Sequence, residues 1–352
     1  MPKVRVEVAV PAALADKAVA AIAKGARTGQ IGDGTRLDRA APVALKINLN
    51  AREVAAGSLH TCLRGGDKSV WCWGRGGAGQ LGTPALIDFA VPINVDGLDD
   101  VEHVDAGQTH SCALRQGTAW CWGANDDGQL GDGTTLGRST PAAVPGPADI
   151  VELALGGAHT CARHAEGTVT CWGRGTEGQL GDMEIMNSPL PVEVWQLANA
   201  VSITAGDRHT CAALADLTVA CWGEGRSGQL GWSTALASHD IPSPVMNLTD
   251  VVEVAAGANH TCARTTSGSV FCWGANEAGQ IGDGTHTTRA GPSGGDRPAF
   301  VNAIALAAGG AHTCAIKSDQ SVFCWGSDSA GQLGEGAFLQ YPTARPTHIS
   351  CP

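Results

Sequence analysis

Short apolar stretches, separated by small residues and polar turns, recur along the chain, and residues 251–285 show one full set. Residues 251–257 are apolar and end in small residues, residues 260–263 begin a second stretch, and residues 269–274 form a third before a glycine-rich loop. Short runs bounded by turn residues are typical of strands. A fourth run is clearest in an earlier unit, at residues 91–95. The pattern therefore predicts units of four antiparallel strands.

The phrase Gly-Gln-Ile/Leu-Gly marks the period of these units. It begins at Gly29, Gly79, Gly128, Gly178, Gly228, Gly279 and Gly331, so successive copies lie 49 to 52 residues apart. A period this strict indicates a repeat architecture in which each unit buries its faces against its neighbours. Four-stranded units repeated around an axis are the blades of a β-propeller.

The number of blades follows from counting complete units. Six units are complete from residue 53 onward, and the first copy of the phrase stands before them. We expect an all-β propeller of the seven-bladed type, with six complete blades plus an incomplete one and a short N-terminal strand–helix segment. The incomplete blade would combine the N-terminal segment, including a strand at residues 42–45, with the C-terminal tail. The alternative is a closed ring of six blades, with residues 42–46 beside residues 321–326.

Two further phrases, Ala-Gly-x-x-His-Thr-Cys and Cys-Trp-Gly, accompany each complete unit with small variations. With them, residues 29–352 resemble the regulator-of-chromosome-condensation repeat family, and more narrowly its cysteine-paired bacterial branch. The resemblance implies a propeller that serves as a binding platform. A few members of the family act as nucleotide-exchange factors for small GTPases, but the repeat phrase alone does not carry that activity.

Twelve of the thirteen cysteines occur as two per unit, nine or ten residues apart. If Cys62 faces Cys72 across a hairpin, His60 lies opposite Gly74 and Thr61 opposite Trp73, and facing cysteines are close enough to be bridged. We therefore predict disulfides within six pairs: Cys62/Cys72, Cys112/Cys121, Cys161/Cys171, Cys211/Cys221, Cys262/Cys272 and Cys314/Cys324. A zinc site made by His60, Cys62 and Cys72 is the first alternative, although a fourth ligand is missing. Reduced core thiols are the second alternative.

A histidine stands two residues before the first cysteine of every complete unit, at His60, His110, His159, His209, His260 and His312. Because an active site requires asymmetry, a residue repeated in every blade indicates a hydrogen-bonded structural role. A glycine three residues before each histidine is expected to make the turn from first to second strand. The chain carries no phosphate loop, nucleophile elbow or zincin helix, so we expect neither an enzyme nor a cofactor.

The N-terminal segment follows a different pattern. Residues 4–10 alternate as a strand does, and residues 12–24 are alanine-rich with the apolar stripe of a helix. Residues 1–34 resemble a fragment of the PII nitrogen-regulatory signal protein family, whose corresponding loop holds ATP phosphates. Gln30 and Thr35 replace the two lysines of that loop, which argues against nucleotide sensing. We therefore divide the chain into a PII-like fragment, 1–34, and a propeller, 35–352, joined by gene fusion. A coincidental helix is the alternative.

The net charge of the chain and the compartment indicated by its cysteines limit the partners that we expect. The net charge of −11 disfavours binding to nucleic acid, and no apolar run has the length of a membrane span. Paired cysteines are typical of oxidising compartments, so we infer an extracytoplasmic ancestry. Residues 12–24 are broken by charges and cannot serve as an export signal, so a cytoplasmic location is the alternative. We expect a monomer.

Loops that vary between blades are the expected recognition surface, because variable loops on a rigid frame usually carry binding. The function we predict is a non-enzymatic scaffold that recognises a protein or a surface glycan through one face. Its predicted contact residues are Arg75, Asp126, Asp127, Arg174, Glu177, Asp207, Arg208, Glu224, Arg226 and Glu277. The alternative is a regulator, either similar to a guanine-nucleotide exchange factor or a nucleotide-responsive PII fusion.

Overall fold

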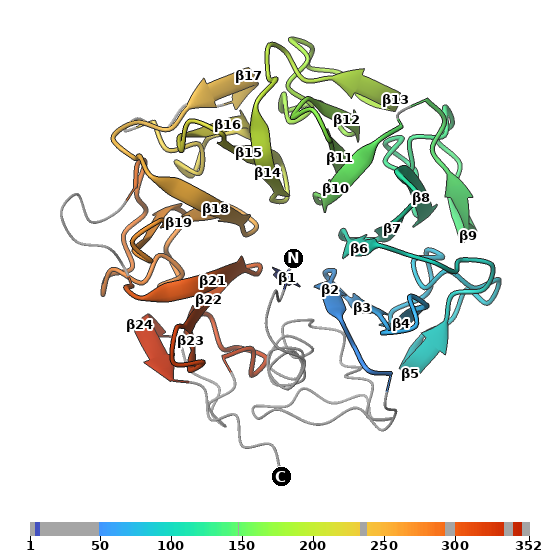
Figure 1. Ribbon diagram of the computed structural model, residues 1–352, viewed down its shortest axis with the longest axis horizontal. Helices are drawn as coiled ribbons and strands as arrows, with labels where there is room; N and C mark the ends of the chain where they lie inside the picture. The colour runs from blue at the N-terminus through green and yellow to red at the C-terminus, as the bar shows by residue number, and fades with distance from the viewer. Residues whose placement is uncertain are drawn as a thin grey trace.

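The computed structural model describes residues 4–7, 49–146, 148–232, 238–292, 300–333 and 341–346. Their strands form six sheets that stand around a central axis as the blades of a propeller (Figure 1). Over these ranges there is no helix, and hence none that could cross a membrane.

Each blade takes its strands from one sequence unit and runs outward from the axis. Blade 1 contains β2 (Glu53–Ala56), β3 (His60–Arg64), β4 (Val70–Gly74) and β5 (Phe89–Asn94). Blade 2 contains β6 (His103–Ala106), β7 (His110–Arg115), β8 (Thr118–Gly123) and β9 (Arg138–Ala143). Blade 3 contains β10 (Ile150–Leu155), β11 (His159–His164), β12 (Val169–Gly173) and β13 (Ser188–Glu193).

The remaining blades follow the same order. Blade 4 contains β14 (Ala200–Ala205), β15 (His209–Leu214), β16 (Val219–Glu224) and β17 (Ser238–Pro244). Blade 5 contains β18 (Val251–Ala256), β19 (His260–Thr265) and β20 (Val270–Gly274), with single bridges from Val270 to Phe300 and from Gly274 to Arg289 at its outer edge. Blade 6 contains β21 (Ala303–Ala308), β22 (His312–Lys317), β23 (Val322–Gly326) and β24 (Tyr341–Pro346).

The expectation of a seven-bladed ring with an N-terminal helix is wrong, because the described chain forms six blades and no helix. The C-terminal tail that we assigned to a seventh blade instead supplies β24, which pairs with β23 and completes blade 6. The strand β1 (Val4–Glu7) pairs antiparallel with β2, as a fifth strand of the first sheet, and also contacts β21. Residues 12–24 and 42–46 lie outside the described residues.

The six-bladed alternative was right about the count. It placed residues 42–46 beside residues 321–326; residues 42–46 lie outside the described residues, and β24 from the same unit pairs with β23. The last blade is therefore built like the others.

The register within each blade agrees with the prediction. Cys62 lies opposite Cys72, His60 opposite Gly74 and Thr61 opposite Trp73. All six predicted disulfides are present, at Cys62–Cys72, Cys112–Cys121, Cys161–Cys171, Cys211–Cys221, Cys262–Cys272 and Cys314–Cys324. These cysteines cannot then supply thiolates to zinc, and no group of three or more metal-binding side chains occurs in the described ranges. The zinc and reduced-thiol alternatives are therefore wrong for these pairs.

The core lies between blades. Trp122 of blade 2 is fully buried and packs against Leu81 and Val95 of blade 1. The equivalent tryptophans Trp172, Trp222, Trp273 and Trp325 pack in the same way against the preceding blade. Because each apolar cluster draws residues from two adjacent blades, including blades 1 and 6, no blade buries its own face alone.

Candidate functional site

Polar contacts between consecutive blades involve several of the repeated residues. A repeated residue that is engaged in such a contact is not available to bind a partner. At the junction of blades 3 and 4, the indole Nε1–H of Trp222 and the hydroxyl of Thr210 both donate to the main-chain carbonyl of Gln179, at 3.0 Å each. We call this arrangement the tryptophan latch. It recurs at five junctions, with Gln80, Gln129, Gln179, Gln229 and Gln280 as acceptors.

The repeated histidines extend the latch. His159 Nε2 lies 3.0 Å from the Thr210 hydroxyl. Because the one hydroxyl proton of Thr210 is donated to Gln179, the histidine must be the donor, which places a hydrogen on its Nε2. The same contact joins His60, His110, His209 and His260 to Ser111, Thr160, Thr261 and Thr313.

Burial keeps these rings neutral. Removal from water lowers the pKa of His209 and His260 to about 3 and the pKa of His312 to about 4. The pKa of His60 is also lowered by burial, to about 4, against the opposing charge of Asp105. A buried neutral imidazole that already donates across a junction has an architectural role.

The glycine three residues before each histidine does make the expected turn, since Gly206 N donates to His209 O at 2.8 Å. The reason that this position needs glycine is different from the one predicted. A Cβ on Gly206 would lie 2.2 Å from His209 Cε1, so any side chain would collide with the imidazole. The glycine therefore leaves space for the latch.

One face of the propeller carries the predicted contact residues. Hydrogen bonds from Arg174 N to Ala158 O and from Glu224 N to Arg208 O, both 2.8 Å, join each third-to-fourth loop to the first-to-second turn of its blade. We call this the loop face. The structure places Glu224 at the end of β16, and it places in these turns and loops Arg75, Asp126, Asp127, Arg174, Glu177, Asp207, Arg208, Arg226 and Glu277.

Three of these residues form a cluster between blades 3 and 4. Glu177 lies 3.5 Å from both Arg174 and Arg208, the second of which comes from the next blade. Partial burial opposes ionisation of Glu177, but hydrogen bonds from Thr176 and Gln179, together with the two arginines, lower its pKa. The loop face therefore presents a fixed anion flanked by cations at this point.

The other predicted residues are engaged singly. Glu224 lies 4.0 Å from Arg226, Asp127 accepts from Asn187 at 2.8 Å, and Asp207 accepts from Gln108 at 3.0 Å. Glu277 accepts from Thr288 at 3.5 Å. Arg75 and Asp126 are exposed. The structure thus gathers the predicted residues on one face without bringing all of them into one site.

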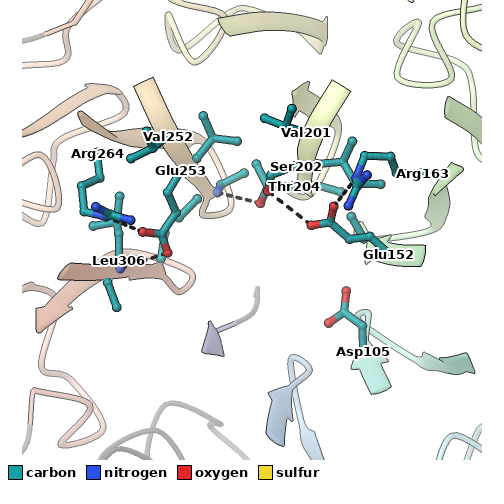
Figure 2. A pocket seen from close by; sticks show the side chains of 18 of the residues that line it. Asp105, Glu152, Arg163, Val201, Ser202, Thr204, Val252, Glu253, Arg264 and Leu306 are labelled. Atoms are coloured by element: carbon teal, nitrogen blue, oxygen red, sulfur yellow. Dashed lines mark hydrogen bonds and ion pairs between the residues drawn. The ribbon is translucent and has the colours of Figure 1, made fainter. Parts of the chain in front are cut away.

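A second candidate site, which the sequence reasoning missed, is a cavity of about 480 Å³ on the axis (Figure 2). The inner strands of blades 2 to 6 line it. Two ion pairs stand in its wall, Glu152–Arg163 at 2.7 Å and Glu253–Arg264 at 2.6 Å. A glutamate on an inner strand followed eleven residues later by an arginine is the sequence signal that could have found them.

The carboxylates in this wall tie neighbouring blades together. Glu253 accepts from Arg264 with one oxygen and from the Leu306 amide of blade 6 with the other, at 3.2 Å. Glu152 accepts from Arg163 with one oxygen and from the Ser202 hydroxyl of blade 4 with the other, at 3.3 Å. Asp105 likewise accepts from the Leu155 amide of blade 3, at 2.8 Å.

Comparison with known proteins agrees with this architecture. Among curated sequences, the chain is 33% identical over 102 residues to the probable E3 ubiquitin-protein ligase HERC4 of Homo sapiens, covering 27% of this chain and 9% of that protein. It is 34% identical over 96 residues to the regulator of chromosome condensation of Drosophila melanogaster, covering 26% of this chain and 17% of that protein. The matched region is thus less than a quarter of either relative.

Solved structures share the fold over most of the chain. Prp20p from Saccharomyces cerevisiae superposes with a TM-score of 0.78 at 22% identity, covering 92% of this chain and 84% of that chain. Human WBSCR16 superposes with a TM-score of 0.77 at 22% identity, covering 88% and 85%. The family model described as RCC1-like domain matches residues 18–352, so this chain belongs to the RCC1-like domain family.

Proposed function

We propose that the protein is a non-enzymatic binding platform that recognises a protein, or a glycan on a surface, through the loop face. The observation that carries the proposal is that two different sets of residues hold the blades together and form the exposed loops. At the five junctions between consecutive blades, the repeated tryptophans, hydroxyl residues and histidines form the latches, whereas the loop-face residues differ from blade to blade. Loops that vary on a rigid scaffold are where recognition usually lies.

The charge pattern of the loop face supports a polar, specific contact. Glu177 is held between Arg174 and Arg208, while Arg226 stays largely exposed next to Glu224. Exposed ion pairs of this kind contribute little to stability. Across an interface, however, charges steer encounter and select partners.

Charge reversal tests the proposal. The variant Arg208→Glu with Glu277→Arg changes two loop-face residues, and we expect it to lose a partner that the unchanged protein retains. The matched control reverses an exposed pair outside that face, Lys68→Glu with Asp100→Lys, whose side chains lie 2.7 Å apart. Retention is measured on proteins captured from an extract and on a glycan array, with thermal unfolding to verify folding. Equal binding by both variants would show that the loop face is not the contact surface.

A regulatory role on a small GTPase is the second candidate. The similarity to the Drosophila regulator of chromosome condensation favours it, although only 96 residues are matched. Release of labelled GDP from small GTPases in the presence of the chain would distinguish a nucleotide-exchange factor from a platform that only binds.

We also propose an origin in an oxidising compartment and in the cysteine-paired bacterial branch. The six disulfides support that compartment. The PII-like fragment, residues 1–34, remains a proposal drawn from sequence, and only residues 4–7 of it are described. Refolding under oxidising conditions with one free thiol remaining would support the compartment, whereas scrambled disulfides would oppose it.

A further inference from the structure

Three third-to-fourth loops expose an aliphatic side chain at the same step of the repeat. Ile87, Leu136 and Met186 each stand eight residues after the first glycine of their Gly-Gln-Leu-Gly phrase, and they are 59%, 75% and 64% exposed. They belong to blades 1, 2 and 3, which are consecutive around the ring (Figure 1). We call these three residues the rim row. At the same step of the sequence, blades 4 and 6 have Leu236 and Leu339, which lie outside the described residues.

The fold does not require an apolar residue at this step. In blade 5 the step is occupied by Thr287, and the loop there keeps the same main-chain contact as the loop of blade 2. The Asn276 side chain donates to the Thr287 carbonyl at 3.1 Å, as the Asn125 side chain donates to the Leu136 carbonyl at 3.2 Å. Since the loop forms with threonine, the exposed aliphatic side chains need a reason other than loop structure.

The main chain at the rim row is held in place. In blades 1 and 3 the carbonyls of Ile87 and Met186 pack over Gly76 and Gly175, where a Cβ would lie 2.0 Å and 1.9 Å from the carbonyl oxygen. Gly175 N also donates to the Asn187 side chain, at 3.1 Å. Because these contacts already order the loops, a partner that binds the rim row loses little free energy in ordering them.

In blade 3 the rim row widens into a larger apolar surface. Met183 and Ile185 are exposed in the same loop as Met186. Leu190 is exposed as well, and a Cβ at Gly133 would lie 3.4 Å from its Cδ2, so Leu190 packs on the blade 2 loop that carries Leu136. The apolar surfaces of blades 2 and 3 therefore adjoin. Exposed apolar surface that spans several elements is typical of an interaction site.

The charges around the rim row are mostly negative. Residues 75–88, 124–138 and 174–187 contain seven carboxylates and three arginines, namely Asp88, Asp126, Asp127, Asp132, Glu177, Asp182, Glu184, Arg75, Arg138 and Arg174. Arg138 and Arg174 are each paired with one of these carboxylates, at 3.5 Å. Arg208 of blade 4 also approaches Glu177, and the carboxylates still outnumber the arginines. This charge attracts a basic partner and repels anionic lipid headgroups.

We propose that the rim row binds a basic segment of another polypeptide. Aliphatic side chains of the segment pack on Ile87, Leu136 and Met186, and its lysines or arginines face the surrounding carboxylates. A glycan has no aliphatic side chains and a simple one has no positive charge, so this chemistry favours a protein. The inference rests on the function proposed for the loop face and narrows its partner to that class.

Binding is tested with the peptide Lys-Leu-Lys-Leu-Lys-Leu-Lys, using isothermal titration calorimetry on the full chain. Lys-Ser-Lys-Ser-Lys-Ser-Lys keeps the charge without the leucines, and Glu-Leu-Glu-Leu-Glu-Leu-Glu keeps the leucines without the positive charge. We expect the first peptide to bind at least about tenfold more tightly than either control. Equal binding of the two lysine peptides, or no binding of the first, would overturn the proposal. Binding of the chain to vesicles of phosphatidylcholine and phosphatidylserine through the rim row would assign it to a membrane and would also overturn the proposal.

Two double variants locate the binding. Ile87→Ser with Met186→Ser removes the first and last side chains of the rim row and should weaken the lysine–leucine peptide at least about tenfold. Ile304→Ser with Met246→Ser is the matched control, since it changes the same residue types at exposed positions outside the third-to-fourth loops. Thermal unfolding reports whether both variants fold. Equal affinity of the two variants for the peptide would show that the rim row is not the site.

The same variants separate this inference from the function proposed for the loop face. Partners are captured from an extract with Ile87→Ser and Met186→Ser, and in parallel with Arg208→Glu and Glu277→Arg. If the rim variant keeps a partner that the charge-reversal variant loses, the rim proposal is wrong and the loop-face proposal stands. Loss of that partner by the rim variant, with retention by the Ile304→Ser and Met246→Ser control, is the result that we expect.

Discussion

The five junctions between consecutive blades differ from the place where the last blade meets the first. At the five junctions, the tryptophan and hydroxyl donors of each blade find the glutamine carbonyl of the blade before it. In blade 1, Thr61 Oγ1 and Trp73 Nε1 are buried with no hydrogen-bond partner among the described residues. There β1 pairs with β2 and contacts β21 instead. Identical residues thus contribute differently according to the neighbour that their blade has.

The largest expected effect on stability comes from acid. The pKa of His60, His209, His260 and His312 is lowered by folding, so the unfolded chain takes up protons first as the pH falls below 6.5. Stability should be complete above that pH and fall towards pH 4, by roughly 1 kcal/mol per histidine and pH unit. Urea midpoints between about pH 7 and about pH 5 measure the loss.

A matched pair of variants isolates one histidine. His209→Gln removes one buried ring and should reduce the slope of stability against pH, whereas His286→Gln changes an exposed loop residue and should leave it unchanged. A midpoint that does not move with pH in the unchanged protein would contradict the assignment of neutral, buried rings.

Removal of a disulfide has the next largest expected effect on stability. That effect should be the same in a blade with a latch and in a blade without one among the described residues. Each bridge closes a hairpin within one blade, so Cys62→Ala with Cys72→Ala and Cys211→Ala with Cys221→Ala should cost similar free energies of unfolding, about 2–3 kcal/mol each. Urea unfolding of the two double variants provides the comparison. A much larger loss at blade 4 than at blade 1 would mean that the bridges also support the latches.

The smallest expected effect tests the comparison directly. Trp222→Phe and Trp73→Phe each remove part of a fully buried side chain. Trp222 loses a hydrogen bond to Gln179, whereas Trp73 has no hydrogen-bond partner in the part of the chain that the structure describes. We expect Trp222→Phe to cost about 1 kcal/mol more than Trp73→Phe. Equal losses in equilibrium unfolding would show that the indole hydrogen bond contributes nothing at a complete junction.

Contacts within one blade were predictable from sequence, and contacts between blades were not. Pairing Cys62 with Cys72 predicted the register of His60 and Trp73 correctly, because an antiparallel hairpin leaves one solution. The acceptor of the latch is a main-chain carbonyl of another unit. Because every residue has a main-chain carbonyl, the residue type does not indicate which one accepts. The sequence did contain one signal of this contact. Among the six units, Ser111 is the one residue at its position that is not threonine, and serine keeps the hydroxyl group that donates.

Two further features were not predicted from the sequence, for other physical reasons. The blade count failed because the first Gly-Gln-Ile-Gly phrase was taken as the mark of a further blade, while β24 completes blade 6 from the tail. The bulges at Val151, Val201, Val252 and Ile304 were not foreseen because a bulge depends on the pairing of two strands, and valine or isoleucine is typical of any strand. On the loop face, varying charged residues could be identified, but not that Glu177 would meet Arg208 of the next blade.

The latch also has a consequence for how such a chain can be rearranged. Every interior junction is made by a glutamine carbonyl and, 31 to 33 residues later, a hydroxyl residue. A crossover between equivalent codons of two units would remove or duplicate one whole blade and still leave every new neighbour with a donor and an acceptor at the same separation. The number of units can therefore change in a single genetic event while each junction between consecutive blades keeps its hydrogen bonds, and the cost of the change falls where blade 6 meets blade 1, at which the described residues form no latch.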